Sequence, residues 1–194
     1  MADGIIRHTS DIMNLILDQR ASTVQYIRIQ TSPNATTWTT RVDVPSKQSP
    51  PSPGLGESFR GKVFYPLTLS DYTLTIPLFL RFQDITAGAV TATSSVYLAL
   101  EPSQGTSHFW LVTGSIPAGA ALANSIHILI PASTFFWIKN IDAATPLMVA
   151  FNEGGSEKSL AIDEEVAVEG RVTEIWLRGD GGAADFELRM ASQF

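Results

Sequence analysis

Apolar and polar residues alternate along residues 72–82, and this pattern restricts the possible folds more than any other part of the sequence. A period of two places every second side chain on one side of a β-strand, so the segment predicts a half-buried strand. Pro77 has no backbone N–H to donate, and we therefore expect this strand to lie at a sheet edge or to contain a bulge. The alternating apolar residues are Tyr72, Leu74, Ile76, Leu78, Leu80 and Phe82.

Short apolar runs separated by turn residues follow this segment to the end of the chain. Regularly spaced short strands of this kind are typical of sandwiches and barrels. We predict an all-β fold, an antiparallel β-sandwich, with the jelly roll as one form that it can take. The expected strands are residues 96–100, 109–113, 126–130, 135–141, 147–151, 159–162, 166–169, 174–178 and 185–190.

The N-terminal residues are the one part of the sequence that predicts a helix. Thr9 or Ser10 can cap a short helix, on which Ile12, Leu15 and Ile16 then fall on one face. A helix of about ten residues is marginal in isolation, so this apolar face must pack on something. Either it covers an open end of its own sandwich, or Ile12, Leu15 and Ile16 bind a partner subunit. We take these three as the candidate partner-binding residues.

Proline and glycine gather in residues 45–56, which predicts an extended linker. The chain then divides into an N-terminal arm at residues 1–44, the linker at residues 45–56 and a β-sandwich domain at residues 57–194. The arm combines the short helix with two strands, expected at residues 23–29 and 36–44. It is too small for a robust core of its own.

The distribution of charge argues against several classes of protein. The 13 Lys and Arg residues are outnumbered by 19 Asp and Glu residues, and a net charge of −6 disfavours nucleic acid as a partner. Between Asp84 and Lys139 the only Asp, Glu, Lys or Arg is Glu101. Proline and glycine break this stretch into runs too short to cross a membrane. We therefore expect part of the stretch to be covered by other subunits of a homo-oligomer, since interface cores are depleted in charge.

Residues arranged for catalysis or metal binding are scarce in the sequence. There is no cysteine, and the three histidines lie far apart. We expect no enzymatic activity, no cofactor and no metal. A calcium ion held by Asp180 and Asp185, or by the acidic run at residues 163–165, is a minor alternative. A hydrolase with a triad dispersed along the sequence is the weakest reading, because no residue pattern supports it.

The four tryptophans provide an alternative function of another class. Trp38 and Trp110 can form an exposed platform for sugars, as in a carbohydrate-binding β-sandwich module. Trp137 and Trp176 lie within strongly apolar runs, so we expect them in the core. His127 alternates with two isoleucines, which predicts that its side chain lies on the opposite face of the strand from them.

Residues 135–191 also resemble the accessory structural proteins of tailed-bacteriophage virions. The segments that carry the resemblance are FWIKNID at residues 136–142, TPLMVAF at 145–151, LAIDEE at 160–165 and VTEIWLR at 172–178. The resemblance implies a non-enzymatic virion protein that is made in the host cytoplasm and works by assembly. A decoration or cement protein that docks on the major capsid protein is the leading expectation, and a tail, neck or baseplate component is the variant. It implies no catalytic or ligand-binding residue.

Overall fold

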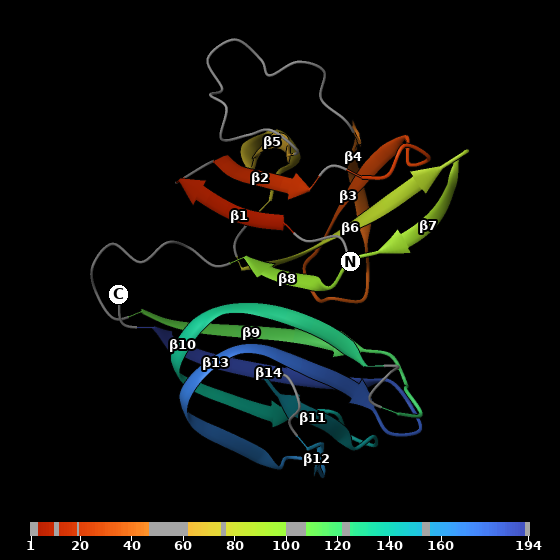
Figure 1. Ribbon diagram of the computed structural model, residues 1–194. Helices are drawn as coiled ribbons and strands as arrows, with labels where there is room; N and C mark the ends of the chain where they lie inside the picture. The colour runs from red at the N-terminus through yellow and green to blue at the C-terminus, as the bar shows by residue number, and fades with distance from the viewer. Residues whose placement is uncertain are drawn as a thin grey trace. The chain divides into compact units, whose positions relative to one another are not determined.

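A computed structural model describes residues 4–9, 12–18, 20–46, 62–74, 77–99, 108–121, 125–152 and 156–192. Within these residues the regular structure is almost entirely β-strand, and the helical element is a single 3-10 turn at Ser70–Tyr72 (Figure 1). The predicted all-β, sandwich-like class is confirmed. The predicted linker at residues 45–56 lies outside the described residues, except for Pro45 and Ser46.

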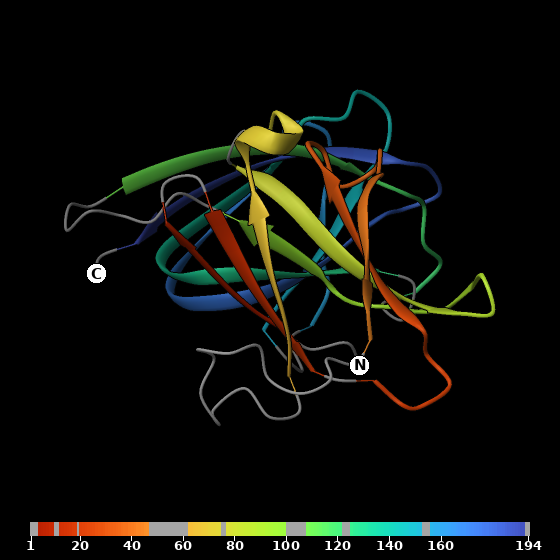
Figure 2. The same ribbon diagram turned by 90° about the horizontal axis from the view of Figure 1, so that it is seen from above.

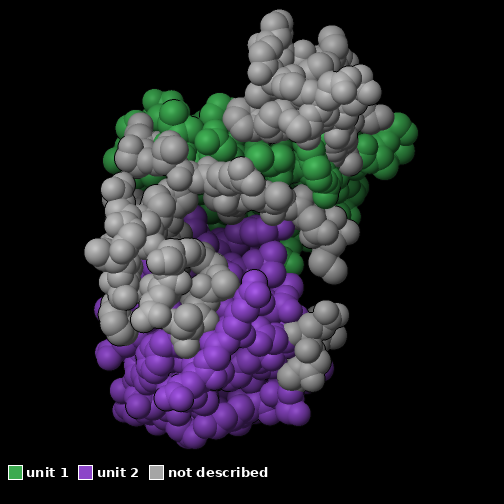
Figure 3. Space-filling view, turned by 60° about the vertical axis from the view of Figure 1, so that its left-hand side comes forward, with its two compact units in different colours: residues 1–31, 39–76, 80–95 green, residues 32–38, 77–79, 96–194 purple. Residues whose placement is uncertain are grey.

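The chain forms two compact units that are interleaved along the sequence (Figure 3). Unit 1 comprises Met1–Thr31, Thr39–Ile76 and Leu80–Ser95, and unit 2 comprises Ser32–Trp38, Pro77–Phe79 and Val96–Phe194. The division into an arm, a linker and a sandwich domain stays a prediction.

Unit 1 contains a three-stranded antiparallel sheet in the order β1-β2-β5, whose red and yellow strands lie side by side in Figure 2. It also contains β4, β7 and most of β3 and β6. Within this set β3 pairs antiparallel with β4, and β6 pairs antiparallel with β7. The strand bounds are β1 (Gly4–Thr9), β2 (Ile12–Asp18), β3 (Tyr26–Ser32), β4 (Thr39–Pro45), β5 (Lys62–Thr68), β6 (Leu78–Thr86) and β7 (Ala89–Thr93).

The predicted N-terminal helix is wrong, because residues 12–18 form the central strand of this sheet. Ile12, Leu15 and Ile16 have helical spacing, but Met13, Leu15 and Leu17 have the spacing of a strand, and these last three are fully buried. Pairing with β1 on one side and β5 on the other selects the strand, since both partners satisfy its backbone hydrogen bonds. The strand pattern therefore prevails over the helical pattern because residues elsewhere in the chain pair with this segment.

The alternation at residues 72–82 predicts the strand only in its second half. Tyr72 ends the 3-10 turn, and Thr73 follows it in the left-handed region with a φ of 52°. Thr75 and Ile76 lie outside the described residues. Strand β6 begins at Leu78, directly after Pro77, so the proline precedes the ladder instead of interrupting it.

Unit 2 contains a curved sheet in which the antiparallel order is β12-β11-β13-β10-β14-β9. Strand β8 pairs in parallel with the first half of β10. The bounds are β8 (Val96–Ala99), β9 (His108–Ile116), β10 (Ile126–Asn140), β11 (Leu147–Phe151), β12 (Lys158–Leu160), β13 (Glu165–Gly179) and β14 (Ala184–Ser192).

Two long strands, β10 and β13, each join a pair of strands that the sequence predicts separately. Both bend strongly in Figure 1. Their pairing register shifts between Leu129 and Phe135, and Gly170 adopts a φ of +135° that a residue with a side chain rarely adopts. Such bulges allow a strand to bend without ending, so the turn signals at Pro131 and Gly170 mark a bend and not a break.

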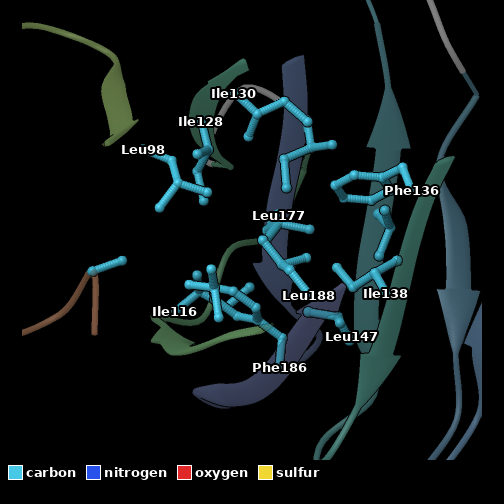
Figure 4. Close-up of a cluster of buried hydrophobic side chains, with 14 of the residues drawn as sticks. Leu98, Ile116, Ile128, Ile130, Phe136, Ile138, Leu147, Leu177, Phe186 and Leu188 are labelled. Atoms are coloured by element: carbon cyan, nitrogen blue, oxygen red, sulfur yellow. The ribbon is translucent and has the colours of Figure 1, made fainter. Parts of the chain in front are cut away.

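The core of unit 2 lies on the concave side of this sheet (Figure 4). Phe136 and Ile138 of β10, Leu177 of β13, and Phe186 and Leu188 of β14 all have less than 1% of their surface exposed. Alternate residues of each strand point into this cluster, which is the periodicity that the sequence predicts.

Asn140, at the end of β10, is a fully buried polar residue that joins three segments of unit 2. Its Nδ2 donates to the carbonyl oxygens of Thr145 at 2.9 Å and Leu160 at 3.0 Å. Its Oδ1 accepts a hydrogen bond from the N–H of Asp142 at 2.9 Å. All the side-chain bonds go to backbone groups, so Asn140 fixes the loop after β10 and the end of β12.

Arg178 of β13 is a second buried polar residue, with 7% of its side chain exposed. Its guanidinium forms a two-bond contact with Glu157 at 2.8 and 3.1 Å, and donates to the carbonyl oxygen of Gly119 at 2.7 Å. The hydrogen bonds from Arg178 lower the pKa of Glu157, and the same contact raises the pKa of Arg178.

Candidate assembly surfaces

The three predicted partner-binding residues lie on two different sides of β2. Ile12 is 39% exposed and Ile16 is half-buried, whereas Leu15 is fully buried on the other side of the strand. Ile12 and Ile16 therefore remain candidates for partner contact. The predicted presentation of all three residues on one helical face is wrong, because side chains alternate along a strand.

Much of the uncharged stretch between Asp84 and Lys139 is buried within the chain itself. Many of its apolar residues belong to the unit 2 core, so intrachain packing accounts for part of the charge depletion. A partner is needed only to explain the neutral residues that stay exposed. The residues of this stretch in the core cluster are Val96, Leu98, Val112, Ile116, Ile128, Ile130, Phe136 and Ile138.

Strand β7 is the part of the stretch that is exposed along its whole length. It follows β6 through a tight turn in which Ala87 and Gly88 both have positive φ, 49° and 80°. Two successive positive φ values define the type I′ turn, which suits the twist of a two-residue hairpin. Among the residues that the structure describes, β7 pairs with β6 alone, and Val90 is 48% exposed. The hairpin thus presents an uncharged strand at a sheet edge.

A second exposed surface crosses β9, β14 and β10 on the face of the unit 2 sheet away from the core. Leu111 of β9 is 56% exposed and lies opposite Arg189 of β14, which in turn lies opposite Trp137 of β10. The Arg189 guanidinium carbon lies 4.5 Å from the centroid of the Trp137 ring, a cation–π contact. Arg189 also pairs with Glu187 at 2.9 Å. Trp137 is buried, as expected, but beneath this arginine and outside the core cluster.

Trp176 of β13 does not lie in the core, and the prediction that placed it there is wrong. Ile175 and Leu177 lie in the core, and Trp176 stands between them on the strand. Because side chains alternate along a strand, Trp176 faces away from the core. Its ring stacks on His127 with centroids 4.4 Å apart and an interplanar angle of 1°. The Nε2 of His127 lies 2.8 Å from Oε2 of Glu174. His127 lies on the face away from its neighbouring isoleucines, as predicted.

The proposed sugar platform of Trp38 and Trp110 does not stand free of the protein. Both rings are partly buried and pack against the unit 2 core. The sequence predicted these two tryptophans at the surface and the other two in the core. In the structure Trp137 is buried, whereas Trp38, Trp110 and Trp176 are all partly buried. Ring burial of this kind reduces the aromatic face on which a sugar can stack.

Three of the five acidic residues named as calcium candidates are engaged in local ion pairs. Asp163 pairs with Lys139 at 3.0 Å, and Glu164 pairs with Lys158 at 3.6 Å. Asp180 accepts a hydrogen bond from Arg178 at 3.3 Å. Across the described parts of the chain, no three His, Cys, Asp or Glu residues are grouped so that they could hold a metal ion. No helix in these parts is long and apolar enough to span a membrane.

Comparison with family models, with curated proteins and with solved structures found no match to this chain. The fold and the surfaces define the class: an all-β, sandwich-like protein with an uncharged, exposed edge strand.

Proposed function

We propose that this chain is a non-enzymatic structural protein that acts by self-assembly as a component of a tailed-phage virion. Its role is to decorate or cement the capsid by docking on the major capsid protein. A tail, neck or baseplate position is the variant of the same proposal. The resemblance of residues 135–191 to phage accessory structural proteins supports the virion setting.

One observation carries the proposal of self-assembly: within the uncharged stretch between Asp84 and Lys139, neutral residues of β7 and β9 are exposed and do not belong to the core. All five residues of β7 are exposed, and Leu111 of β9 is the most exposed large apolar side chain in the described residues. The centres of protein–protein interfaces contain few charged residues, because burying an unpaired charge is costly. These surfaces suit burial between subunits.

The outward residues of β2 give a second contact of the same kind. Ile12 and Ile16 lie on its outward side, away from the buried Leu15. The same side of β2 carries Asp18, which pairs with Lys62, so this surface is apolar with a charged end. Two exposed surfaces on one chain allow each copy to contact more than one neighbour. A protein that covers a lattice needs such multiple contacts, since many weak contacts together give strong attachment.

Sedimentation velocity of the purified chain over a range of concentrations tests the self-assembly. We expect oligomers that persist at high salt, because the contacts are neutral and salt screens only ionic ones. A chain that remains monomeric from about 10 µM to about 1 mM would refute self-assembly. The virion setting is tested separately by the flanking genes, where capsid, portal or tail genes are expected and a set of metabolic genes would contradict it.

A further inference from the structure

We infer that unit 1 contains a binding site for an oxyanion, a carboxylate or a phosphate group, formed by Arg41, Tyr65 and Tyr72. These residues come from β4, from β5 and from the 3-10 turn after β5, which is drawn as the yellow coil in Figure 2. The site uses none of the residues assigned to self-assembly, so it goes beyond the proposed function and is independent of it.

Arg41 is the extra residue of a β-bulge in β4. Two successive residues of β3, Ile29 and Gln30, pair with residues of β4 that are two positions apart. A bulge changes the direction in which a side chain points, and bulges are common beside functional sites. The Nε of Arg41 donates to Oγ1 of Thr31 at 2.6 Å, and Thr31 is only 1% exposed. The bulge therefore turns the guanidinium toward the buried side of β3.

Arg41 lacks a carboxylate partner among the residues that the structure describes. Four other arginines, Arg20, Arg28, Arg178 and Arg189, each pair with an aspartate or a glutamate. Arg41 is half-buried, and a charge withdrawn from water without an opposite charge is costly. A guanidinium presents its N–H groups in a planar fork that matches the two oxygens of a carboxylate or a phosphate. A bound oxyanion would supply the missing negative charge.

Two tyrosine hydroxyls complete the cluster around this guanidinium. The Arg41 guanidinium carbon lies 5.9 Å from the centroid of the Tyr72 ring, and the Tyr72 hydroxyl oxygen lies 3.4 Å from that of Tyr65. Both tyrosines are half-buried. The hydrogen bond with Tyr72 raises the pKa of Tyr65 to about 12, so Tyr65 keeps its proton at neutral pH. Two hydroxyls that bond to each other use one proton between them, so the other proton can be donated to a ligand.

The turn that positions Tyr72 has a strained backbone. Thr73 follows Tyr72 with a φ of 52° and a ψ of 46°, in the left-handed region that a β-branched residue rarely adopts. The N–H of Thr73 donates to the carbonyl oxygen of Ser70 at 3.1 Å, which closes the turn. Strained residues of this kind are concentrated at ligand sites. The strain is a separate reason to assign a binding role to this turn.

Asp71, in the same turn, limits the affinity of the site. It is exposed, and its charge contributes to the raised pKa of Tyr65, so it lies close enough to repel an oxyanion bound at the two hydroxyls. One half-buried cation and one hydroxyl proton bind an oxyanion weakly in water. We expect a dissociation constant of about 1 to 10 mM. Asp71→Asn removes the repulsion and should tighten binding about threefold at low salt.

Fluorine NMR of the chain labelled with 3-fluorotyrosine tests the site, because the chain has only four tyrosines. The probes are inorganic phosphate and glucuronate, with glucose as the uncharged control, all added at constant ionic strength. We expect phosphate, glucuronate or both to shift the signals of Tyr65 and Tyr72 until they saturate. The signals of Tyr26 and Tyr97 should stay unchanged. The probe that binds more tightly shows whether the site prefers a phosphate or a carboxylate.

Two arginine variants show whether the guanidinium holds the anion. Arg41→Gln removes the charge and should weaken binding at least about tenfold. Arg171→Gln removes the same charge from an exposed position on β13 of unit 2 and should bind as the natural chain does. Circular dichroism and thermal unfolding establish that the variants remain folded. If Arg41→Gln does not fold, the tighter binding expected of Asp71→Asn still tests the site, because Asp71 is exposed.

Several outcomes would overturn the site. Signals of Tyr65 and Tyr72 that stay fixed up to about 50 mM of both anions would do so, since this concentration is well above the expected constant. Arg41 would then serve only as an inward-pointing charge that protects an edge strand from pairing with other chains. Shifts that persist in Arg41→Gln, equal shifts with glucose, or weaker binding in Asp71→Asn would also overturn it. Self-assembly is measured separately by sedimentation and is unaffected by these results.

Discussion

Replacement of Asn140 by alanine should destabilise unit 2 more than any single surface change. The side chain makes three hydrogen bonds in a fully buried position, at 2.9, 3.0 and 2.9 Å. Each such bond contributes about 1 kcal/mol net, and a buried carbonyl left without a donor costs about 1 to 3 kcal/mol. Because some carbonyls can recruit water when the side chain is removed, we expect Asn140→Ala to lose about 3 to 5 kcal/mol of unfolding free energy.

Asn140→Asp tests the donor role separately from the size of the side chain. The introduced carboxyl keeps an acceptor for Asp142 but faces the carbonyl oxygens of Thr145 and Leu160. Burial beside two acceptors raises the pKa of this carboxyl above its unfolded value of about 3.9. The raised pKa favours the folded state below about pH 4, and this contribution is lost as the pH rises through the folded pKa.

Urea unfolding followed by tryptophan fluorescence measures both variants, with Ser159→Ala as the control. Ser159 is exposed on β12, next to Leu160, and its loss should change the unfolding free energy by less than about 0.5 kcal/mol. If Asn140→Ala costs less than about 1 kcal/mol, the three bonds do not anchor the loop and the reasoning fails. A stability of Asn140→Asp that does not fall between pH 4 and pH 7 would show that its carboxyl is not buried.

Three further predictions concern single residues. The contact with Arg178 lowers the pKa of Glu157, so the ion pair stabilises the folded state above the unfolded pKa of about 4.3 and this stabilisation is lost as the pH falls through the folded pKa. Glu157→Gln should therefore make the unfolding free energy depend less on pH in acid. Gly179→Ala should lower the melting temperature far more than Gly181→Ala. A Cβ added at Gly179 would lie 2.0 Å from a backbone oxygen. A Cβ added at Gly181 would meet no atom within 4 Å, so that variant suffers only from the positive φ of the backbone. In chemical unfolding, Leu15→Asp should lower the unfolding free energy by more than about 4 kcal/mol, and Ile16→Asp by less than about 1.5 kcal/mol. Equal losses in the two variants would contradict the assignment of residues 12–18 to a strand.

The strands of unit 2 could be predicted largely from local sequence. The run at residues 147–151 predicts β11 with the bounds that the structure has, because apolar residues there lie between clear turn residues. Prediction was less accurate where a strand bends. Pro131 and Gly170 each predict the end of a strand. In the structure the neighbouring strand continues to pair on both sides of each residue. The residues around Pro131 and Gly170 do not indicate which strand that partner is.

The N-terminal segment shows why a periodic pattern can fail. Leu15 belongs both to the helical set with Ile12 and Ile16 and to the strand set with Met13 and Leu17. A short segment cannot distinguish the two, and the pairing with β5, about fifty residues away, decides between them. The β7 edge was missed for a different reason: its small residues show no apolar alternation, and only Ala87-Gly88 offers a weak hairpin signal.

The pairing of β9 with β14 sets the order in which unit 2 can fold. Ile116 pairs with Ala184 and His108 with Ser192, while β10, β11, β12 and β13 all lie between the two strands in sequence. Closing so long a loop is entropically slow, and strand pairs of this kind form late. Until then the neutral β9 has no partner strand and can pair with another unfolded copy. Refolding should therefore be slow and sensitive to concentration, and a chaperone that holds β9 apart should raise the yield of folded protein.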